Sequence, residues 1–192
     1  MKKTTTITAI GLLLAGEAQA GSAEVMVGKE TTTLDAKLSG NIAGNAGFFF
    51  RARPTVGYDG AVSHFELADA TYSLGKGIDA VAEVQMMANI DPRIGMQYYG
   101  ENNNVAVYGL ITVGTNYAEL LAFAQYMPKL TDKVSGFAKI ETVQDAGSQG
   151  YVWGTERLRL GVDVKGYKVG LGADITPPDK TVNPGLFVSK SL

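Results

Sequence analysis

The chain has 192 residues, no cysteine, one histidine and a formal net charge of −2. The absence of cysteine excludes disulfide bridges, and so few soft ligands predict neither a metal site nor a cofactor. No basic patch or acidic tail stands out, which argues against nucleic acid as a partner.

The first twenty residues, MKKTTTITAIGLLLAGEAQA, have the order of a secretory signal peptide. Two lysines precede a short apolar run from Ile7 to Ala15, and Ala18-Gln19-Ala20 supplies a small-residue cleavage site. The apolar run is too short to span a bilayer as a helix. We therefore expect residues 1–20 to be removed after Ala20 and residues 21–192 to form a single domain.

The rest of the chain predicts β-strands separated by turn signals such as Tyr58-Asp59-Gly60, Gly75-Lys76-Gly77 and Lys165-Gly166. No long segment carries the 3.6-residue apolar period of a helix. The predicted strands are 24–29, 33–42, 47–57, 61–74, 78–89, 92–99, 104–113, 116–127, 133–143, 150–164, 167–176 and 184–192.

Each strand has one apolar face of small and branched residues and one face that mixes charges with aromatics and glycine. In 78–88, for example, Ala80 and Val84 share one face, and Asp79 and Glu83 share the other. This pattern fits a soluble β-sandwich, whose polar face meets water, and equally a membrane barrel, whose polar face lines the lumen.

Three features favour the barrel. Most strands are about nine to twelve residues long, which suits a tilted strand that crosses a bilayer. The last strand ends on Leu192 and can close the sheet by pairing with the first strand. With an even strand number, tight turns fall on the periplasmic side, and the longer connections near 144–149 and 177–183 fall outside. We predict an all-β, closed antiparallel transmembrane β-barrel of about 12 strands, with ten as the alternative.

The signal peptide, the segment YMPKLTDKVSGFAKIE (residues 126–141) and the terminal NPGLFVSKSL resemble small porin-like outer-membrane β-barrels of Gram-negative bacteria. Strands that end barrels of this class usually finish on an aromatic residue, whereas this chain finishes on Leu192. The resemblance implies a place in the cell outer membrane, contact with outer-membrane lipid and lipopolysaccharide, and insertion by the barrel-assembly machinery. Tyr72, Tyr98, Tyr126 and Tyr167, near strand ends, are expected to form interfacial girdles.

The sharpest candidate site is formed by two arginine pairs, Arg51/Arg53 and Arg157/Arg159, each projecting from one face of a strand. Lys139 and Glu141 precede the second pair on the neighbouring strand, and the first pair is expected near Asp35, Lys37 and Asp69. We predict that the lumen is lined by Arg51, Arg53, Glu83, Glu119, Lys139, Glu141, Arg157 and Arg159. These charges could form an eyelet that sorts solutes or an internal salt-bridge lattice that fills the barrel. The mixed faces together carry eight basic and eight acidic residues, so no strong ion preference is expected.

The sequence thus favours a porin-like passive channel for small hydrophilic solutes, without a catalytic step. A non-conducting structural or adhesive surface barrel and a soluble secreted β-sandwich binding protein stay as alternatives. A surface hydrolase is the weakest alternative: His64 has Glu66 on its face, but Ser63 points to the opposite side. We interpret His64 as a histidine of the barrel rim.

Overall fold

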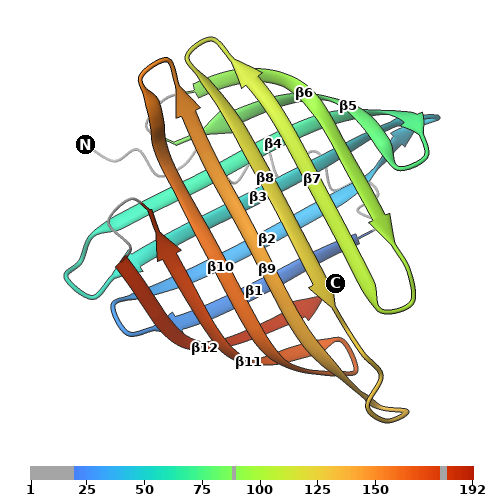
Figure 1. Ribbon diagram of the computed structural model, residues 1–192, viewed down its shortest axis with the longest axis vertical. Helices are drawn as coiled ribbons and strands as arrows, with labels where there is room; N and C mark the ends of the chain where they lie inside the picture. Colours follow the sequence, from blue (N-terminus) through green and yellow to red (C-terminus); the bar gives the residue numbers. More distant parts are fainter. Residues whose placement is uncertain (1–19, 88–89, 178–180) are drawn as a thin grey trace.

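A computed structural model describes residues 20–87, 90–177 and 181–192. They form one closed antiparallel barrel in which every strand pairs with its sequence neighbours and β1 pairs with β12 (Figure 1). The strands are β1 Ala20–Gly28, β2 Thr31–Ala43, β3 Ala46–Gly57, β4 Val62–Gly75, β5 Ile78–Met86, β6 Ile90–Glu101, β7 Val105–Gly114, β8 Tyr117–Tyr126, β9 Val134–Gly147, β10 Gly150–Val164, β11 Tyr167–Thr176 and β12 Thr181–Ser191. The predicted twelve-stranded barrel is confirmed, and the ten-stranded alternative is wrong.

The described residues contain no helix that could span a membrane. The predicted signal peptide lies outside the described residues, except for Ala20, which begins β1.

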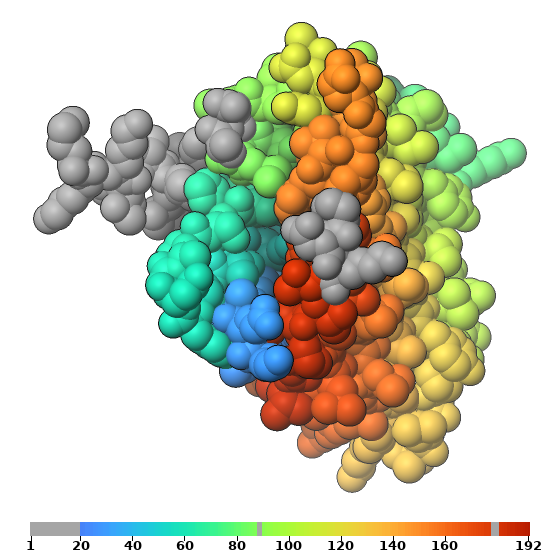
Figure 2. All heavy atoms as spheres, turned by 60° about the vertical axis from the view of Figure 1, so that its left-hand side comes forward, coloured from blue at the N-terminus to red at the C-terminus, as the bar shows by residue number. Residues whose placement is uncertain are grey.

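Closure of the barrel depends on the first and last strands. Their register runs from Ser22 opposite Ser191 to Gly28 opposite Gly185. In the space-filling view these two strands, blue and red, meet side by side at the surface (Figure 2). A closed sheet leaves no row of unpaired backbone groups, which is the condition for β-structure in hydrocarbon. The alternative of a two-layer soluble sandwich is therefore wrong.

The turns at the end that holds both termini follow the sequence signals closely. Lys76 and Gly77 have φ of 57° and 77°, and Lys165 and Gly166 have φ of 56° and 82°. Positive φ at both central residues is the signature of a type I′ hairpin, whose twist matches that of the flanking strands.

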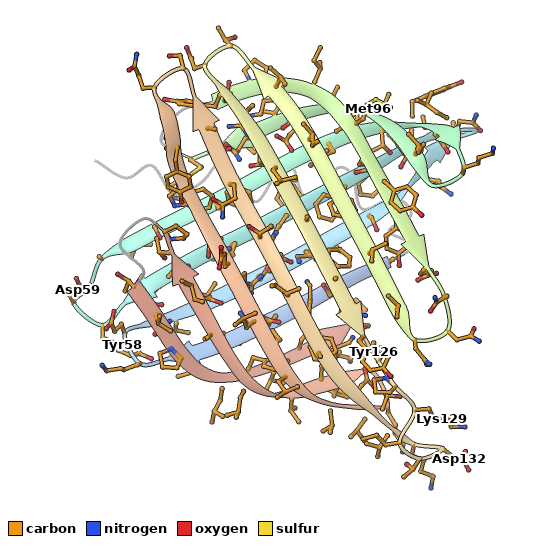
Figure 3. The ribbon with its side chains drawn as sticks, in the orientation of Figure 1. Tyr58, Asp59, Met96, Tyr126, Lys129 and Asp132 are labelled. Atoms are coloured by element: carbon orange, nitrogen blue, oxygen red, sulfur yellow. The ribbon has the colours of Figure 1, made fainter. Side chains whose placement is uncertain are left out.

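The expected asymmetry of loop length is wrong. Residues 144–147 belong to β9, and only residues 148–149 separate β9 from β10. The strand continues there because its alternation continues: Val143 and Asp145 are both buried inside the barrel. The longest connection whose residues are all described, 127–133, lies at the end that holds the termini, where Figure 3 labels Lys129 and Asp132.

The outside of the barrel is an apolar belt. Ile94, Leu171 and Leu186 are 73%, 64% and 64% exposed, and Met96 points outward from β6 (Figure 3). Such exposure of large apolar side chains is costly in water and natural against lipid. Tyrosines flank the belt: Tyr72, Tyr98, Tyr126 and Tyr167 are exposed at strand ends near the termini, and Tyr58, Tyr117 and Tyr151 near the opposite rim. This is the arrangement expected of interfacial girdles.

Candidate functional site in the barrel interior

The eight residues predicted to line the lumen come from β3, β5, β8, β9 and β10. Seven of them are buried and Lys139 is half-buried. Because apolar residues of the same strands are exposed on the outside, these charges face the interior. Seven of the eight belong to two separate groups of interacting charges.

The first group, which we call the arginine cluster, joins strands from both sides of the closure. Its members are Glu24, Asp35, Lys37, Arg51, Lys139, Glu141, Arg157, Arg159 and Asp174. Arg51 donates from Nε and Nη2 to the two carboxylate oxygens of Asp35, at 2.9 and 2.8 Å. This fork geometry matches guanidinium to carboxylate and holds both side chains in place.

Glu141 is the centre of the arginine cluster. Its carboxylate accepts hydrogen bonds from Lys37 Nζ at 3.0 Å, Lys139 Nζ at 2.7 Å and Arg157 Nη1 at 3.1 Å. Arg51 also donates to it. The side chain is only 1% exposed, so these four cations replace the water that a carboxylate needs.

The second arginine pair extends the cluster to the first and eleventh strands. Arg159 donates from Nε to Glu24 at 2.9 Å and from Nη1 to Asp174 at 2.8 Å. Arg157 lies opposite Glu141 on one side and Asp174 on the other, and it also pairs with Asp35. The cross-strand ion pairs expected between β9 and β10 are confirmed for Glu141.

The second group, the acidic cluster, is gathered around one guanidinium. Arg93 Nη1 lies 3.0 Å from Asp145, 3.4 Å from Glu119 and 3.9 Å from Glu83, and Arg93 Nε lies 2.8 Å from Asp91. Asp69 is directly opposite Glu83 in the register of β4 and β5. The cluster is therefore Asp69, Glu83, Asp91, Arg93, Glu119 and Asp145.

Neutral side chains complete the acidic cluster. Thr112 Oγ1 donates to Glu83 at 3.2 Å, and Arg93 Nη2 donates to Gln85 Oε1 at 2.6 Å. Gln85 in turn donates to Glu119.

Arg53 is a member of neither cluster. Its guanidinium lies 5.9 Å from the centre of the Phe65 ring, and its buried Nε and Nη1 have no hydrogen-bond acceptor among the described residues. Asp69 lies on the strand next to the first arginine pair, opposite Phe49 and Glu83, and forms no ion pair with Arg51 or Arg53 in the described residues.

Sequence reasoning named seven of the nine members of the arginine cluster and did not choose Glu24 and Asp174. Glu24 lies on β1, and Asp174 lies on β11 opposite Arg157, where it accepts a hydrogen bond from Arg159. Their inward phase is visible in the alternation, which is the signal that could have included them. Arg93, the centre of the acidic cluster, was not among the predicted lining residues.

An apolar core accompanies the two charged clusters inside the barrel. It consists of Phe65, Leu67, Val81, Leu110, Leu121 and Val143. Trp153 stacks on Phe65 with ring centres 5.7 Å apart. Arg51, Glu83, Glu119 and Glu141 are each only 1% exposed, whereas the walls of a wide aqueous pore would be wet. Around the two charged clusters and the apolar core, the interior is packed.

A hollow of about 660 Å³ opens inside the barrel toward the end that holds the termini. Lys37, Arg51 and Glu141 form its deep side, because they lie further from that end of the barrel than Gly40 and Asn41. Its remaining polar and aromatic lining includes Asp79, Gln97, Tyr99, Tyr108 and Phe123. A small hydrophilic solute could therefore reach the arginine cluster from this end.

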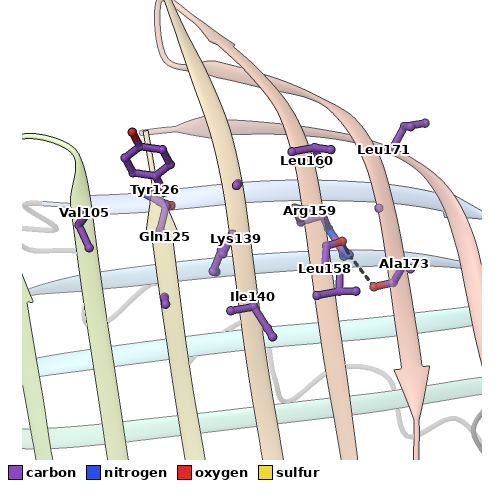
Figure 4. A pocket seen from close by; sticks show the side chains of 13 residues that line it. Val105, Gln125, Tyr126, Lys139, Ile140, Leu158, Arg159, Leu160, Leu171 and Ala173 are labelled. Atoms are coloured by element: carbon purple, nitrogen blue, oxygen red, sulfur yellow. Dashed lines mark hydrogen bonds between the residues drawn. The ribbon is translucent and has the colours of Figure 1, made fainter. Parts of the chain in front are cut away.

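The lipid-facing surface also has a groove, of about 630 Å³, across β7 to β11 (Figure 4). Small residues such as Ala124, Ala138 and Ala173 hollow it between larger ones such as Tyr126 and Leu160. Behind it, Arg159 donates to the backbone oxygen of Ala173 at 3.3 Å (Figure 4).

In the described residues, no hydrogen bond joins His64 to a serine or a carboxylate. This side chain is exposed on β4, opposite Pro54. No group of three or more acidic or histidine side chains is arranged to hold a metal ion within residues 20–87, 90–177 and 181–192.

Comparison with known proteins defines the class. No protein-family model and no curated protein sequence matches the chain. Among solved structures, the KdgM porin shares 11% sequence identity over 90% of this chain and 99% of its own, with a TM-score of 0.54. The same values hold for the KdgM porin in complex with disordered oligogalacturonate. OpdL of Pseudomonas aeruginosa has a TM-score of 0.45 at 11% identity, covering 87% of this chain and 66% of its own.

The likeness to the KdgM porin concerns the fold. Together with the apolar belt, the closed sheet and the charged interior, it shows that the chain has the fold of an outer-membrane β-barrel similar to that of the KdgM porin.

Proposed function

We propose that this protein is a narrow outer-membrane channel for the passive passage of small hydrophilic solutes. The observation that carries the proposal is the charged interior: ion-paired side chains lie on the inner face of a closed barrel, and three of them, Lys37, Arg51 and Glu141, line a hollow of about 660 Å³. Rings of charged side chains are the usual means by which pores select what passes. The solved complex of the KdgM porin with oligogalacturonate supports a hydrophilic solute in a barrel of this fold.

The proposed pore-lining residues are Arg51, Arg53, Glu83, Glu119, Lys139, Glu141, Arg157 and Arg159. Because seven of them are buried, passage requires these side chains to move apart. We therefore expect a small conductance and exclusion of all but small solutes.

The remaining parts of the proposal concern the path to the membrane. Residues 1–20 direct export and are removed, and the barrel-assembly machinery inserts the domain among outer-membrane lipid and lipopolysaccharide. No catalytic step and no cofactor belong to this function.

Recording single-channel currents in planar bilayers tests the proposal. The wild type should give small steps, and the double variant Arg51→Ala/Arg157→Ala should give larger ones, because two large side chains leave the constriction. Leu171→Ala, on the lipid-facing side, is the matched control and should leave the step size unchanged.

A second candidate, a non-conducting structural or adhesive barrel, is favoured by the packing of the same interior. The apolar core and the buried ion pairs could brace the wall rather than line a path. Folded protein that gives no current, even as the double alanine variant, would support this candidate and exclude the channel.

A further inference from the structure

The barrel separates its interior charges into two regions of opposite sign. The arginine cluster has five basic and four acidic side chains. The acidic cluster has five carboxylates and a single guanidinium. The excess of negative charge is therefore concentrated around β4 to β9, although the sequence as a whole is almost neutral.

Several oxygens of the acidic cluster have no partner, and they are well buried. Asp69 is 5% exposed, and no hydrogen-bond donor reaches either of its carboxylate oxygens in the described residues. Glu83 Oε2 and Glu119 Oε1 are likewise buried without a partner there. Buried carboxylate oxygens of this kind are strongly destabilising unless positive charge compensates them.

The available cation cannot compensate them all. Arg93 already contacts Glu83, Asp91, Glu119 and Asp145, and its Nη2 donates to Gln85. Asp69 faces Glu83 directly across the strand pair, where two like charges repel. Only a proton or a small cation could join these two carboxylates.

We propose that the acidic cluster binds small inorganic cations inside the barrel. Carboxylate, amide and hydroxyl oxygens are the donors that group 1 and group 2 cations prefer, and Asp69, Glu83, Glu119, Gln85 and Thr112 supply them. No group of three or more acidic or histidine side chains in the described residues is arranged to hold a metal ion, so at most two carboxylates bind the ion directly. Such a site binds weakly and exchanges its ion readily, as conduction requires. Where the channel proposed above conducts, it is selective for cations.

Thermal unfolding of the full barrel in detergent tests the binding without relying on conduction. At neutral pH, the midpoint should rise by a few degrees when choline chloride is replaced by potassium or calcium chloride at equal ionic strength, because choline is too bulky to enter. Asp69→Asn should raise the midpoint in choline and abolish the difference between salts, since it removes the like-charge pair. Glu101→Gln, an exposed carboxylate outside the cluster, should behave as the wild type.

The outcomes separate this proposal from that of the channel. Equal midpoints in all three salts would overturn it, as would a salt effect that persists unchanged in Asp69→Asn. If acidification stabilises the barrel and the three salts give equal midpoints, protons rather than cations neutralise the carboxylates, and the proposal is likewise overturned. In bilayers, reversal potentials under a potassium chloride gradient should show cation selectivity that Glu83→Gln weakens; anion selectivity would refute the inference. Absence of current would refute the channel, while the unfolding experiment would still decide on cation binding.

Discussion

Replacing Glu141 by glutamine should strongly destabilise the barrel. The substitution preserves the shape of the side chain and removes the charge that four cations share. Asp35, Glu24 and Asp174 would then be the only carboxylates of the cluster for the same five basic side chains. The missing negative charge would be at a position where the side chain is 1% exposed, so water could not replace it. Breaking a buried ion pair by removing one partner typically costs about 3–5 kcal/mol. We expect a loss in this range.

Urea unfolding in lipid vesicles can measure this loss. The chain has a single tryptophan, Trp153, which stacks on Phe65 inside the barrel and reports directly on the packed interior. Asp132→Asn is the matched control, because Asp132 forms its 2.8 Å ion pair with Lys129 at the surface, where its side chain is 94% exposed. Exposed pairs of this kind contribute little.

A double variant checks the physical reason. Lys139→Gln in the Glu141→Gln background removes one of the cations that has lost its partner. The double variant should therefore lose less unfolding free energy than the sum of the losses of the two single variants. A loss for Glu141→Gln as small as that of the control would refute the reasoning. It would show that water, rather than the four cations, solvates this carboxylate.

Three further predictions concern closure, the lipid-facing surface and export. Gly28→Ala places a Cβ 2.2 Å from Asn183 Nδ2 and should displace the Asn183 side chain, whose Oδ1 accepts a hydrogen bond from Glu30 N at 2.8 Å. The loss should be about 1–3 kcal/mol in urea unfolding and should be smaller in an Asn183→Ala background. Leu171→Arg should cost about 2–4 kcal/mol in the same assay if this position lies near the bilayer midplane, whereas Thr176→Arg at the end of the strand should cost far less. Amino-terminal sequencing of protein extracted from outer membranes should begin at Gly21, and a start at Met1 would contradict the predicted cleavage.

Strand number, strand order along the chain and the two faces of each strand were predictable because they depend on local alternation. The segment from Tyr151 to Val164, for example, predicts its own inward and outward positions without reference to any neighbour. The type I′ turns at Lys76-Gly77 and Lys165-Gly166 are local in the same sense. Local reasoning failed at the loops expected near 144–149 and 177–183, where β9 continues to Gly147 and β12 already begins at Thr181.

Partnership across the barrel was not predictable. Glu24 and Arg159 are 135 positions apart in sequence and meet only because β12 closes on β1. A count along the inward faces is balanced in charge, and it was the basis for expecting no ion preference. Such a count says nothing of position, whereas register and closure gather Arg51, Arg157 and Arg159 in one region and leave Asp69, Glu83 and Glu119 in another.

Alternation along the chain therefore determined the strands and their apolar and charged faces, and strand length with an even strand number favoured a barrel over a sandwich. Which charges neutralise one another, and which carboxylates are left without compensation, was decided only by the three-dimensional arrangement. The physical reason is the distance over which each effect acts. The direction of a side chain is set within its own strand. Coulomb interactions in a poorly hydrated interior depend instead on distances between strands that are far apart in the sequence.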